Sequence, residues 1–375
     1  MNFNLSEYSK SMRQLLVFDV LIKEEVVNKD AFLSDLIISP TSYRRAKIKE
    51  QNVGNEIVLK LAKHFKIRLV SEKYIKRLEK LISKIYLDIN YRVTDRHEQY
   101  LEELSNLDKE VTVLFPIVKL FKLFVVTFSN KNVPDIIDEY VDDFLYVSQF
   151  ESFYNSDLLE IFELLKLTFS STLTKEMLAK QYSNGIAYSI IAGKQYFKEQ
   201  YFESLFFAQK AKEFFIKENN YKRCITINFT ILNNFASTGA FDDFYSLAKE
   251  QFLTVRAFNS NSNSNSIDVV TSRKFMAMTA LSVNKLDEVL ELVEEVSNIT
   301  LSEVFCYIIA KFKLLDKKSF DKWYLEYMDK LTISSKFRAT CDLLIDYLKK
   351  PEKRKIELFK NCGVIKSLIE VIKWL

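Results

Sequence analysis

Glycine and proline are scarce in this chain, and their scarcity limits the folds open to it. Among 375 residues there are five glycines and four prolines, while 48% of the residues are hydrophobic. Proteins rich in β-strands, and doubly wound α/β proteins, need many more of both residues at their turns. We therefore predict an all-α protein with short polar loops between its helices. The length makes two or more domains the natural expectation.

Positive charge is concentrated near the N-terminus. The whole chain carries a formal net charge of +4. Between residues 40 and 68, eight lysines and arginines stand against two glutamates, a net of 8 − 2 = +6, so the remainder sums to 4 − 6 = −2. A basic patch of this kind is what binding to nucleic acid requires. A solvated helix face is the alternative explanation of such a cluster.

Several features favour a cytoplasmic protein. The four cysteines lie far apart and form no CxxC pair, which favours free thiols in a reducing compartment. The first residues, MNFNLSEYSK, are polar, so we expect no signal peptide. The most apolar stretch, residues 111–128, contains Pro116, Lys119 and Lys122, whereas a membrane-spanning helix needs about 20 mostly apolar residues. We predict a buried helix there and no membrane partner.

Residues 1–70 are predicted to form a first domain of four short helices. Three of these helices follow from apolar residues at helical spacing, or from Asn28 as a capping residue ahead of the helix. They cover residues 11–25, 29–36 and 55–65.

The remaining helix lies in the stretch ISPTSYRRAKIKE, residues 38–50. The Ser39 hydroxyl can cap it by accepting from a free backbone N–H, and Pro40 suits the first helical position, where its missing N–H costs nothing. Tyr43 and Ala46 can then pack inward. A helix, a tight turn and a second helix with a basic outer face describe a helix-turn-helix, whose second helix enters the DNA major groove.

A resemblance to a known family becomes specific over residues 29–67. The segment KDAFLSDLIISPTSYRRAKIKEQNVGNEIVLKLAKHFKI resembles the helix-turn-helix of phage-repressor (Xre-type) regulators, and NEIVLKLAKHFKI is similar to the fourth helix of that family. The resemblance implies a double-stranded DNA operator as partner. The residues that match base-reading positions are Thr41, Arg44 and Arg45. The residues expected at phosphates are Ser39, Ser42, Lys47 and Lys49. Arginine reads guanine with two hydrogen bonds, while contacts to phosphate set position.

Two residues depart from the pattern of that family. Leu33 stands where a small residue is usual, and Ile37 stands where the turn usually has glycine. Isoleucine would be strained in a left-handed conformation. The turn therefore either takes another geometry or belongs to a different helix-turn-helix subclass, such as the winged domains of virulence regulators of the Mga type.

Residues 71–97 are predicted to form a linker helix with a heptad seam. Its apolar residues are spaced 3, 4, 3 and 4 apart, just under three heptads. They are Ile75, Leu78, Ile82, Ile85 and Ile89. Two alternatives follow: the stripe packs on its own chain, or it pairs with a second copy in a homodimer and fixes the distance between two N-terminal domains.

Residues 98–375 are predicted to form helical repeats. A polar turn, an aromatic or aliphatic residue and a short amphipathic helix recur at Phe202, Phe241, Leu286 and Phe320, in steps of 39, 45 and 34 residues. The longest step contains NSNSNSNS, residues 259–266, which indicates an inserted flexible loop. Such steps are typical of tetratricopeptide-like (TPR-like) repeats, so we predict a TPR-like α-solenoid. The alternative is an unrelated all-helical domain.

The layout of the chain resembles the peptide-pheromone receptors of Gram-positive bacteria and their phages, the Rgg, PlcR, PrgX and AimR regulators. This resemblance implies a dimeric transcription regulator that senses a short signalling peptide in quorum sensing. An extended peptide needs partners for its backbone N–H and C=O groups, and asparagine offers both a donor and an acceptor. Candidate peptide contacts on the predicted first helices of repeats are Asn184, Tyr188, Asn228 and Asn233. Helix capping or solvent exposure is the alternative role for each.

Positive signals for catalysis are missing from the sequence. The two histidines form no HxxxH or HExxH pattern, and there is no Walker A loop or GxGxxG motif. We expect no enzymatic activity, no metal site and no cofactor. The second reading of function is a repeat protein like the Rap-type relatives, which bind a response regulator or another protein and need no base-reading helix.

Overall fold

The computed structural model describes residues 3–5, 11–48, 55–93, 95–109, 111–128, 133–258, 267–294, 299–331, 335–362, 364 and 366–374. Within these ranges the chain forms helices and no strands, which confirms the predicted all-α class. The chain divides into two compact units, Met1–Gln181 and Tyr182–Leu375. The domain boundaries expected from the sequence, after residues 70 and 97, both fall inside the first unit.

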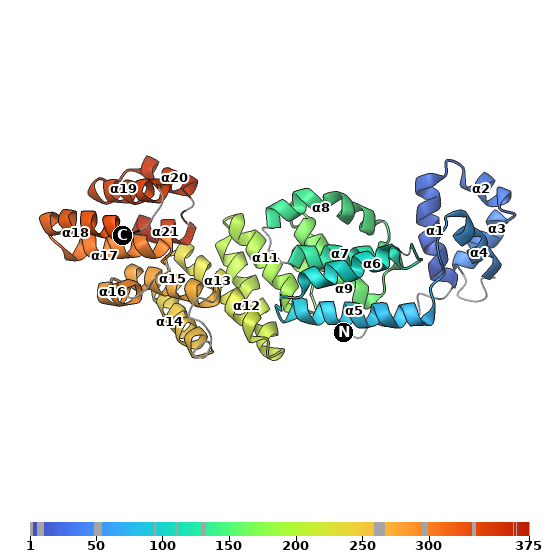
Figure 1. Ribbon diagram of the computed structural model, residues 1–375, viewed down its shortest axis with the longest axis horizontal. Helices are drawn as coiled ribbons and strands as arrows, with labels where there is room; N and C mark the ends of the chain where they lie inside the picture. The colour runs from blue at the N-terminus through green and yellow to red at the C-terminus, as the bar shows by residue number, and fades with distance from the viewer. Residues whose placement is uncertain are drawn as a thin grey trace. The chain divides into compact units, whose positions relative to one another are not determined.

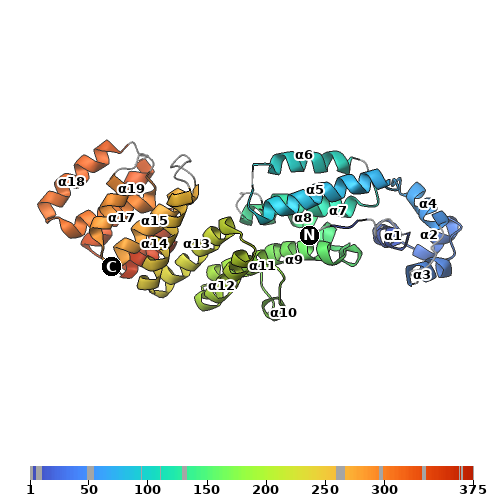
Figure 2. The ribbon, with the colours of Figure 1, turned by 90° about the horizontal axis from the view of Figure 1, so that it is seen from below.

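In the first unit, α1–α4 gather at one end and α5 runs alongside α7 (Figures 1 and 2). The helices of this unit are α1 (Ser11–Glu25), α2 (Lys29–Asp35), α3 (Pro40–Ile48), α4 (Asn55–His64), α5 (Glu72–Asn90), α6 (His97–Asp108), α7 (Phe115–Phe128), α8 (Val133–Ser148), the 3-10 turn η2 (Glu151–Phe153), α9 (Ser156–Phe169) and α10 (Lys175–Ala179). We call α1–α4 the head.

The head has its own apolar core, and α3 enters that core through a single large side chain. Tyr43 is fully buried, and its hydroxyl donates to the carbonyl of Leu15 in α1 at 3.0 Å. Burial raises the pKa of Tyr43, and the nearby Asp19 raises it further, so the hydroxyl stays protonated and can keep donating. The predicted inward face of α3 is therefore confirmed at Tyr43, and this contact fixes the rotation of α3 about its axis.

A buried carboxylate joins three helices of the head. Asp19 in α1 is 6% exposed and pairs with the ammonium groups of Lys29 in α2 and Lys47 in α3, the latter at 2.6 Å. Burial alone would raise the pKa of Asp19, but the hydrogen bonds and charges of the two lysines outweigh it, and the pKa lies below its ordinary value of 3.8. Lys29 also lies over the Tyr43 ring, 4.9 Å from its centre.

The heptad stripe of α5 is buried in its own chain. All five of its residues are at most 5% exposed. The helix packs on α7, and the ring of Phe3 lies between Tyr86 of α5 and Phe121 of α7, with ring centres 5.9 and 5.4 Å away. The first of the two alternatives therefore holds, and this stripe is not available as a dimer seam.

Most of the apolar stretch at residues 111–128 forms α7, from Phe115 to Phe128, and this helix is largely buried, as predicted. In the described ranges, no helix combines the length and the apolar character needed to cross a membrane.

The second unit is built from α11 (Gly185–Phe197), α12 (Tyr201–Lys217), α13 (Tyr221–Thr238), α14 (Phe241–Phe258), α15 (Ile267–Ser282), α16 (Leu286–Glu294), α17 (Leu301–Leu314), α18 (Lys317–Lys330), α19 (Ser335–Lys349), α20 (Lys353–Asn361) and α21 (Lys366–Trp374). The four recurring residues of the sequence all lie in the first turn or so of alternate helices, α12, α14, α16 and α18. The tract at residues 259–266 lies outside the described residues.

The first four helices of this unit are joined by single left-handed residues. Glu199, Asn219 and Gly239 have φ angles of 62°, 54° and 75° and follow α11, α12 and α13 at steps of 20 residues. At each, the next backbone N–H bonds to the carbonyl five residues earlier, at 3.0, 2.7 and 3.1 Å. These bonds satisfy carbonyl groups that the helix end leaves open. A new helix begins two residues after each left-handed residue.

Helix α21 does not continue the stack but packs back on α13 and α15. Lys366 of α21 forms an ion pair with Glu199 at 3.0 Å, across 167 residues of sequence. Its ammonium also lies 5.4 Å from the centre of the Tyr196 ring. In an open solenoid each repeat contacts only its neighbours. This contact between distant helices is therefore a departure from a purely sequential stack.

The Asp19 cluster predicts a specific loss of stability. Asp19→Asn leaves the ammonium groups of Lys29 and Lys47 without their counter-charge, which should lower the free energy of unfolding by about 2–3 kcal/mol. Because the pKa of Asp19 is lowered in the fold, its stabilisation is complete above the ordinary value of 3.8 and is lost as pH falls through the folded pKa. Urea denaturation of the full chain at pH 7 and at decreasing pH measures both effects.

The matched control is Asp30→Asn. Asp30 pairs with Arg44 at 3.5 Å, and both side chains are more than half exposed, so its loss should cost less than about 1 kcal/mol. Equal effects of the two substitutions, or an unchanged acid dependence in Asp19→Asn, would contradict the structural role of Asp19.

Candidate functional site

The turn between α2 and α3 is left-handed at Ile37, whose φ is 56°. The Ile37 N–H donates to the Ser34 carbonyl at 2.9 Å, and the Ile38 N–H donates to the Leu33 carbonyl at 2.7 Å. Leu33 and Ile38 are both buried, as in the hydrophobic contact that accompanies this type of helix end, the Schellman motif. Of the sequence alternatives, a different turn geometry is therefore wrong: the chain accepts isoleucine where glycine is usual.

A further contact holds this turn against α4. The Lys60 ammonium donates to the Ile37 carbonyl at 3.2 Å and pairs with Glu56 at 3.1 Å. The Ile37 side chain itself is 84% exposed and adds little burial. A left-handed conformation costs a residue with a side chain about 1–2 kcal/mol, so the two backbone bonds and the Lys60 contact must offset that cost.

Helix α3 begins where the sequence predicted. The Ser39 hydroxyl accepts from the Ser42 N–H at 3.4 Å, and the Tyr43 N–H donates to the Ser39 carbonyl at 2.9 Å. Pro40 is the first helical residue. The turn and the cap together fix the direction in which the first turn of α3 leaves the head.

The exposed side of α3 carries most of the predicted DNA contacts. With Tyr43 buried, the side chains on the outer face are those of Thr41, Ser42, Arg44 and Arg45, and Ser39 is exposed at the helix start. Arg44 pairs loosely with Asp30 at 3.5 Å, while Arg45 has no ion pair within the described residues. Exposed pairs of this kind contribute at most about 1 kcal/mol, so Arg44 can exchange its partner at low cost.

Two of the predicted phosphate contacts have a different outcome. Lys47 is bound to Asp19 at 2.6 Å and its side chain is only 26% exposed, so the structure gives it an internal partner. Lys49 lies outside the described residues. The sequence did not reveal the ion pair of Lys47, because Asp19 and Lys47 lie 28 residues apart and meet only when α1 packs on α3.

Asn184 and Tyr188, two of the four predicted peptide contacts, have structural roles. The Asn184 side chain is 4% exposed and caps α11 by accepting from the Ala187 N–H at 3.0 Å. The Tyr188 hydroxyl accepts from the Tyr182 N–H at 3.1 Å, and its ring packs on Phe207 and Phe214. The alternative of helix capping is therefore the observed arrangement for Asn184, and Tyr188 lies in the core.

Asn228 and Asn233 are both on α13 and are half-buried. The Asn228 carbonyl oxygen is buried and has no hydrogen-bond partner in the described structure. Two further amides of this kind were not predicted from the sequence, Asn234 on α13 and Gln251 on α14. Each donates through its N–H₂ group, Asn234 to Ser204 at 2.8 Å and Gln251 to the Ile225 carbonyl at 3.2 Å.

The carbonyl oxygens of these amides are left without donors, as at Asn228. Unpaired buried acceptors are rare and costly, so each of these amides lies where the fold supplies no N–H donor to its carbonyl oxygen. One signal in the sequence could have revealed the buried amide of Gln251. This polar residue stands at helical spacing between Ala248 and Val255, and all three lie on the buried side of α14.

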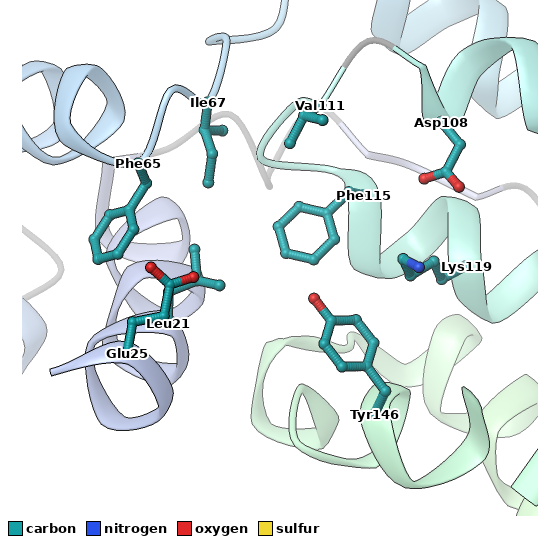
Figure 3. A pocket seen from close by; sticks show the side chains of 9 residues that line it. All are labelled: Leu21, Glu25, Phe65, Ile67, Asp108, Val111, Phe115, Lys119 and Tyr146. Atoms are coloured by element: carbon teal, nitrogen blue, oxygen red, sulfur yellow. The ribbon is translucent and has the colours of Figure 1, made fainter. Parts of the chain in front are cut away.

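A pocket of about 360 Å³ opens in the first unit, between the head and α6–α8 (Figure 3). Leu21, Glu25, Phe65 and Ile67 lie on one side, and Asp108, Val111, Phe115, Lys119 and Tyr146 lie on the other (Figure 3). The Lys119 ammonium is 5.2 Å from the centre of the Tyr146 ring. Burial, followed by the charges of Glu24, Asp108 and Glu25, raises the pKa of Tyr146 to about 12, so the hydroxyl is neutral at pH 7.

The two sides of this pocket are joined by the backbone. The Arg68 N–H, just after the head, donates to the Val111 carbonyl at 2.9 Å. The pocket therefore marks how the head docks on the rest of the first unit, and its lining shows no nucleophile beside a general base. Within the described residues, no three His, Cys, Asp or Glu side chains converge as metal ligands would.

Comparisons with known proteins identify no relative. No family model, no curated protein and no solved structure shows significant similarity to the chain. The function must therefore be inferred from the geometry of α3 and of the second unit.

The strained turn before α3 predicts a stabilising substitution. Ile37→Gly removes the steric cost of the left-handed conformation while losing an exposed side chain, and should raise the free energy of unfolding by about 1 kcal/mol. The control is Val27→Gly, at an exposed β-branched residue that lacks a positive φ angle and should be destabilised by glycine. Urea denaturation of the full chain compares them; a loss of stability in both variants would show that the turn carries no strain.

Proposed function

We propose that the protein is a cytoplasmic DNA-binding transcription regulator whose second unit senses a short signalling peptide. In this proposal the head is a helix-turn-helix, the second unit is a TPR-like repeat domain, and the protein acts as a homodimer. The observation that carries the proposal is α3: a helix with a defined start, its aromatic side chain anchored in the head and its arginines directed outward.

The exposed face of α3 suits a major groove. Arg44 and Arg45 are the candidates to read guanine, with Thr41 beside them, and Ser39 and Ser42 are candidates for phosphate contacts at the helix start. Lys47 supports this face indirectly, because its ion pair with Asp19 holds α3 on α1. The basic residues of the head thus divide into those that hold the fold together and those free to meet DNA.

The second unit supports peptide sensing through one unpaired amide. An extended peptide presents a row of backbone N–H donors, and the carbonyl oxygen of Asn228 lacks a donor, whereas Asn234 and Gln251 are buried out of reach. Asn228 is half-buried, so rotation of its side chain can bring the amide toward a ligand. Asn233, one to two turns further along α13, is the remaining predicted contact.

DNA reading is tested by selecting bound sequences from a random pool of double-stranded DNA and measuring affinity for the selected site at fixed salt. Arg45→Ala should weaken specific binding by about 1–3 kcal/mol, and Arg44→Ala should act in the same way, because each removes a contact to a base. Arg338→Ala is the matched control, since Arg338 also forms an exposed pair with aspartate, at 3.3 Å, but lies in α19.

If the Arg44→Ala, Arg45→Ala double variant binds the selected site as tightly as the unchanged protein, α3 is not the reading helix. If no sequence is selected and binding to nonspecific DNA is insensitive to salt, the protein does not bind DNA as proposed. A protein-binding repeat module would then be the better explanation of the fold.

Peptide sensing is tested with a library of short linear peptides of randomised sequence, passed over the immobilised full chain. Asn228→Ala should weaken binding of a selected peptide about tenfold, because one hydrogen bond to the peptide backbone is lost. Asn361→Ala, at an exposed position of α20, should have no effect. Selection of no peptide, or equal affinity of the two variants, would count against peptide binding at Asn228.

A further inference from the structure

The exposed face of α12 carries a stripe of residues at heptad spacing, within which Phe206 has the Lys210 ammonium of the same helix over its ring at 4.4 Å. The positions of the stripe are spaced 4, 3, 4 and 3 apart, and all five are exposed. They are Phe202, Phe206, Gln209, Glu213 and Ile216. Phe202, Phe206 and Ile216 are 77%, 52% and 57% exposed. In the described chain the phenylalanines with more than half of their surface exposed are these two and Phe197, which ends α11.

The opposite face of α12 is fully occupied. Ser204, Ala208 and Ala211 are completely buried, and the Ser204 hydroxyl donates to the Ala192 carbonyl of α11 at 2.8 Å and accepts from Asn234 of α13 at 2.8 Å. These bonds fix the rotation of α12 between its two neighbours. The phenylalanine stripe therefore cannot turn inward and remains on the surface of the unit.

Exposed aromatic residues at heptad spacing are the pattern of a helix that pairs with another helix. A helix of 17 residues is about 25 Å long, enough for two such helices to bury on the order of 1,000 Å². Tyr221, at the start of the next helix, α13, is also exposed, at 62%.

We propose that α12 pairs antiparallel with α12 of a second copy of this chain. The charges beside the stripe select this partner and this direction. Glu203 flanks the N-terminal end and Lys217 flanks the C-terminal end, on the same side of the stripe. In an antiparallel pair each Glu203 meets Lys217 of the other copy, whereas a parallel pair would place the equivalent flanks on opposite faces and leave both charges without this partner.

The middle of the stripe fits the same arrangement. Antiparallel packing brings Gln209 of one copy beside Glu213 of the other, so that the amide N–H groups can donate to the carboxylate. Polar residues within an apolar seam specify register at some cost in stability. Phe206 and Ile216 then meet on either side of this polar centre. This α12 pair is the interface of the homodimer in the proposed function, on which the inference rests.

The test measures the mass of the full chain in solution by sedimentation velocity over a range of concentrations. The unchanged protein should be a dimer, and the Phe202→Glu, Phe206→Glu double variant should be a monomer with unchanged helix content and thermal unfolding. Leu253→Glu, Leu325→Glu is the matched control, since both leucines are more than half exposed elsewhere in the second unit. It should remain a dimer.

Charge exchange tests the direction of pairing. Glu203→Lys or Lys217→Glu alone should raise the dissociation constant of the dimer about tenfold, because two attractive pairs become repulsive. The Glu203→Lys, Lys217→Glu double variant should recover the original value, since the pairs are restored with exchanged signs.

A monomeric unchanged protein, a dimer that survives both phenylalanine substitutions, or a charge exchange without recovery would overturn the proposal. The proposal would also be overturned if the phenylalanine variant dimerises normally but loses binding to phosphatidylcholine–phosphatidylglycerol vesicles. The stripe would then be a membrane contact. None of these outcomes bears on DNA reading, which the arginine substitutions in α3 test separately.

Discussion

Seven helices of the described chain end in the same backbone geometry, and the arrangement of both units depends on it. After each helix comes a residue with φ between 54° and 75°, and the following N–H bonds to the carbonyl five residues earlier. These residues are Ile37, Lys66, Arg92, Glu199, Asn219, Gly239 and Asn284. At five of them, those after α2, α11, α12, α13 and α15, the geometry turns the chain sharply and the next helix packs on the one before it. Only one of the seven residues is glycine, although glycine adopts this conformation at least cost.

The sequence predicted the type of structure better than its turns. The scarcity of glycine and proline correctly indicated an all-α chain, and the helix at residues 11–25 was found with the predicted bounds. The same scarcity hid the left-handed turns, because Lys66, Arg92 and Glu199 carry no local mark of that conformation. At Ile37 the family pattern named the position of the turn, yet isoleucine argued against the geometry that the chain adopts.

The candidate sites were predictable only where the evidence is local. The start of α3 depends on Ser39 and Pro40, which are neighbours in the sequence, and the prediction was confirmed. The partner of Lys47 and the unpaired carbonyl of Gln251 depend on the packing of distant helices, and the sequence showed neither. Asn184 shows the converse: an amide that suits a ligand is equally suited to capping a helix.

Electrostatics and packing act together in the head. Asp19 uses two lysines to hold α1, α2 and α3 together, and Tyr43 sets the rotation of α3 in the same region. The arginines of α3 are consequently presented by a helix whose position does not depend on them. Arg44 and Arg45 can therefore be substituted without loss of the fold, as the proposed reading surface would require in order to acquire a new target sequence.

The return of α21 to α13 and α15 alters how the second unit should unfold. A stack of helices held only by neighbours can lose its end repeats one at a time, because each contact is local in sequence. Here the Lys366–Glu199 pair and the packing of α21 close a loop of chain that contains every helix from α12 to α20. Closing so long a loop slows folding, since chain entropy is lost before the contact forms. In return it makes the intervening helices a single cooperative block, so that a disturbance at one helix is shared by all of them.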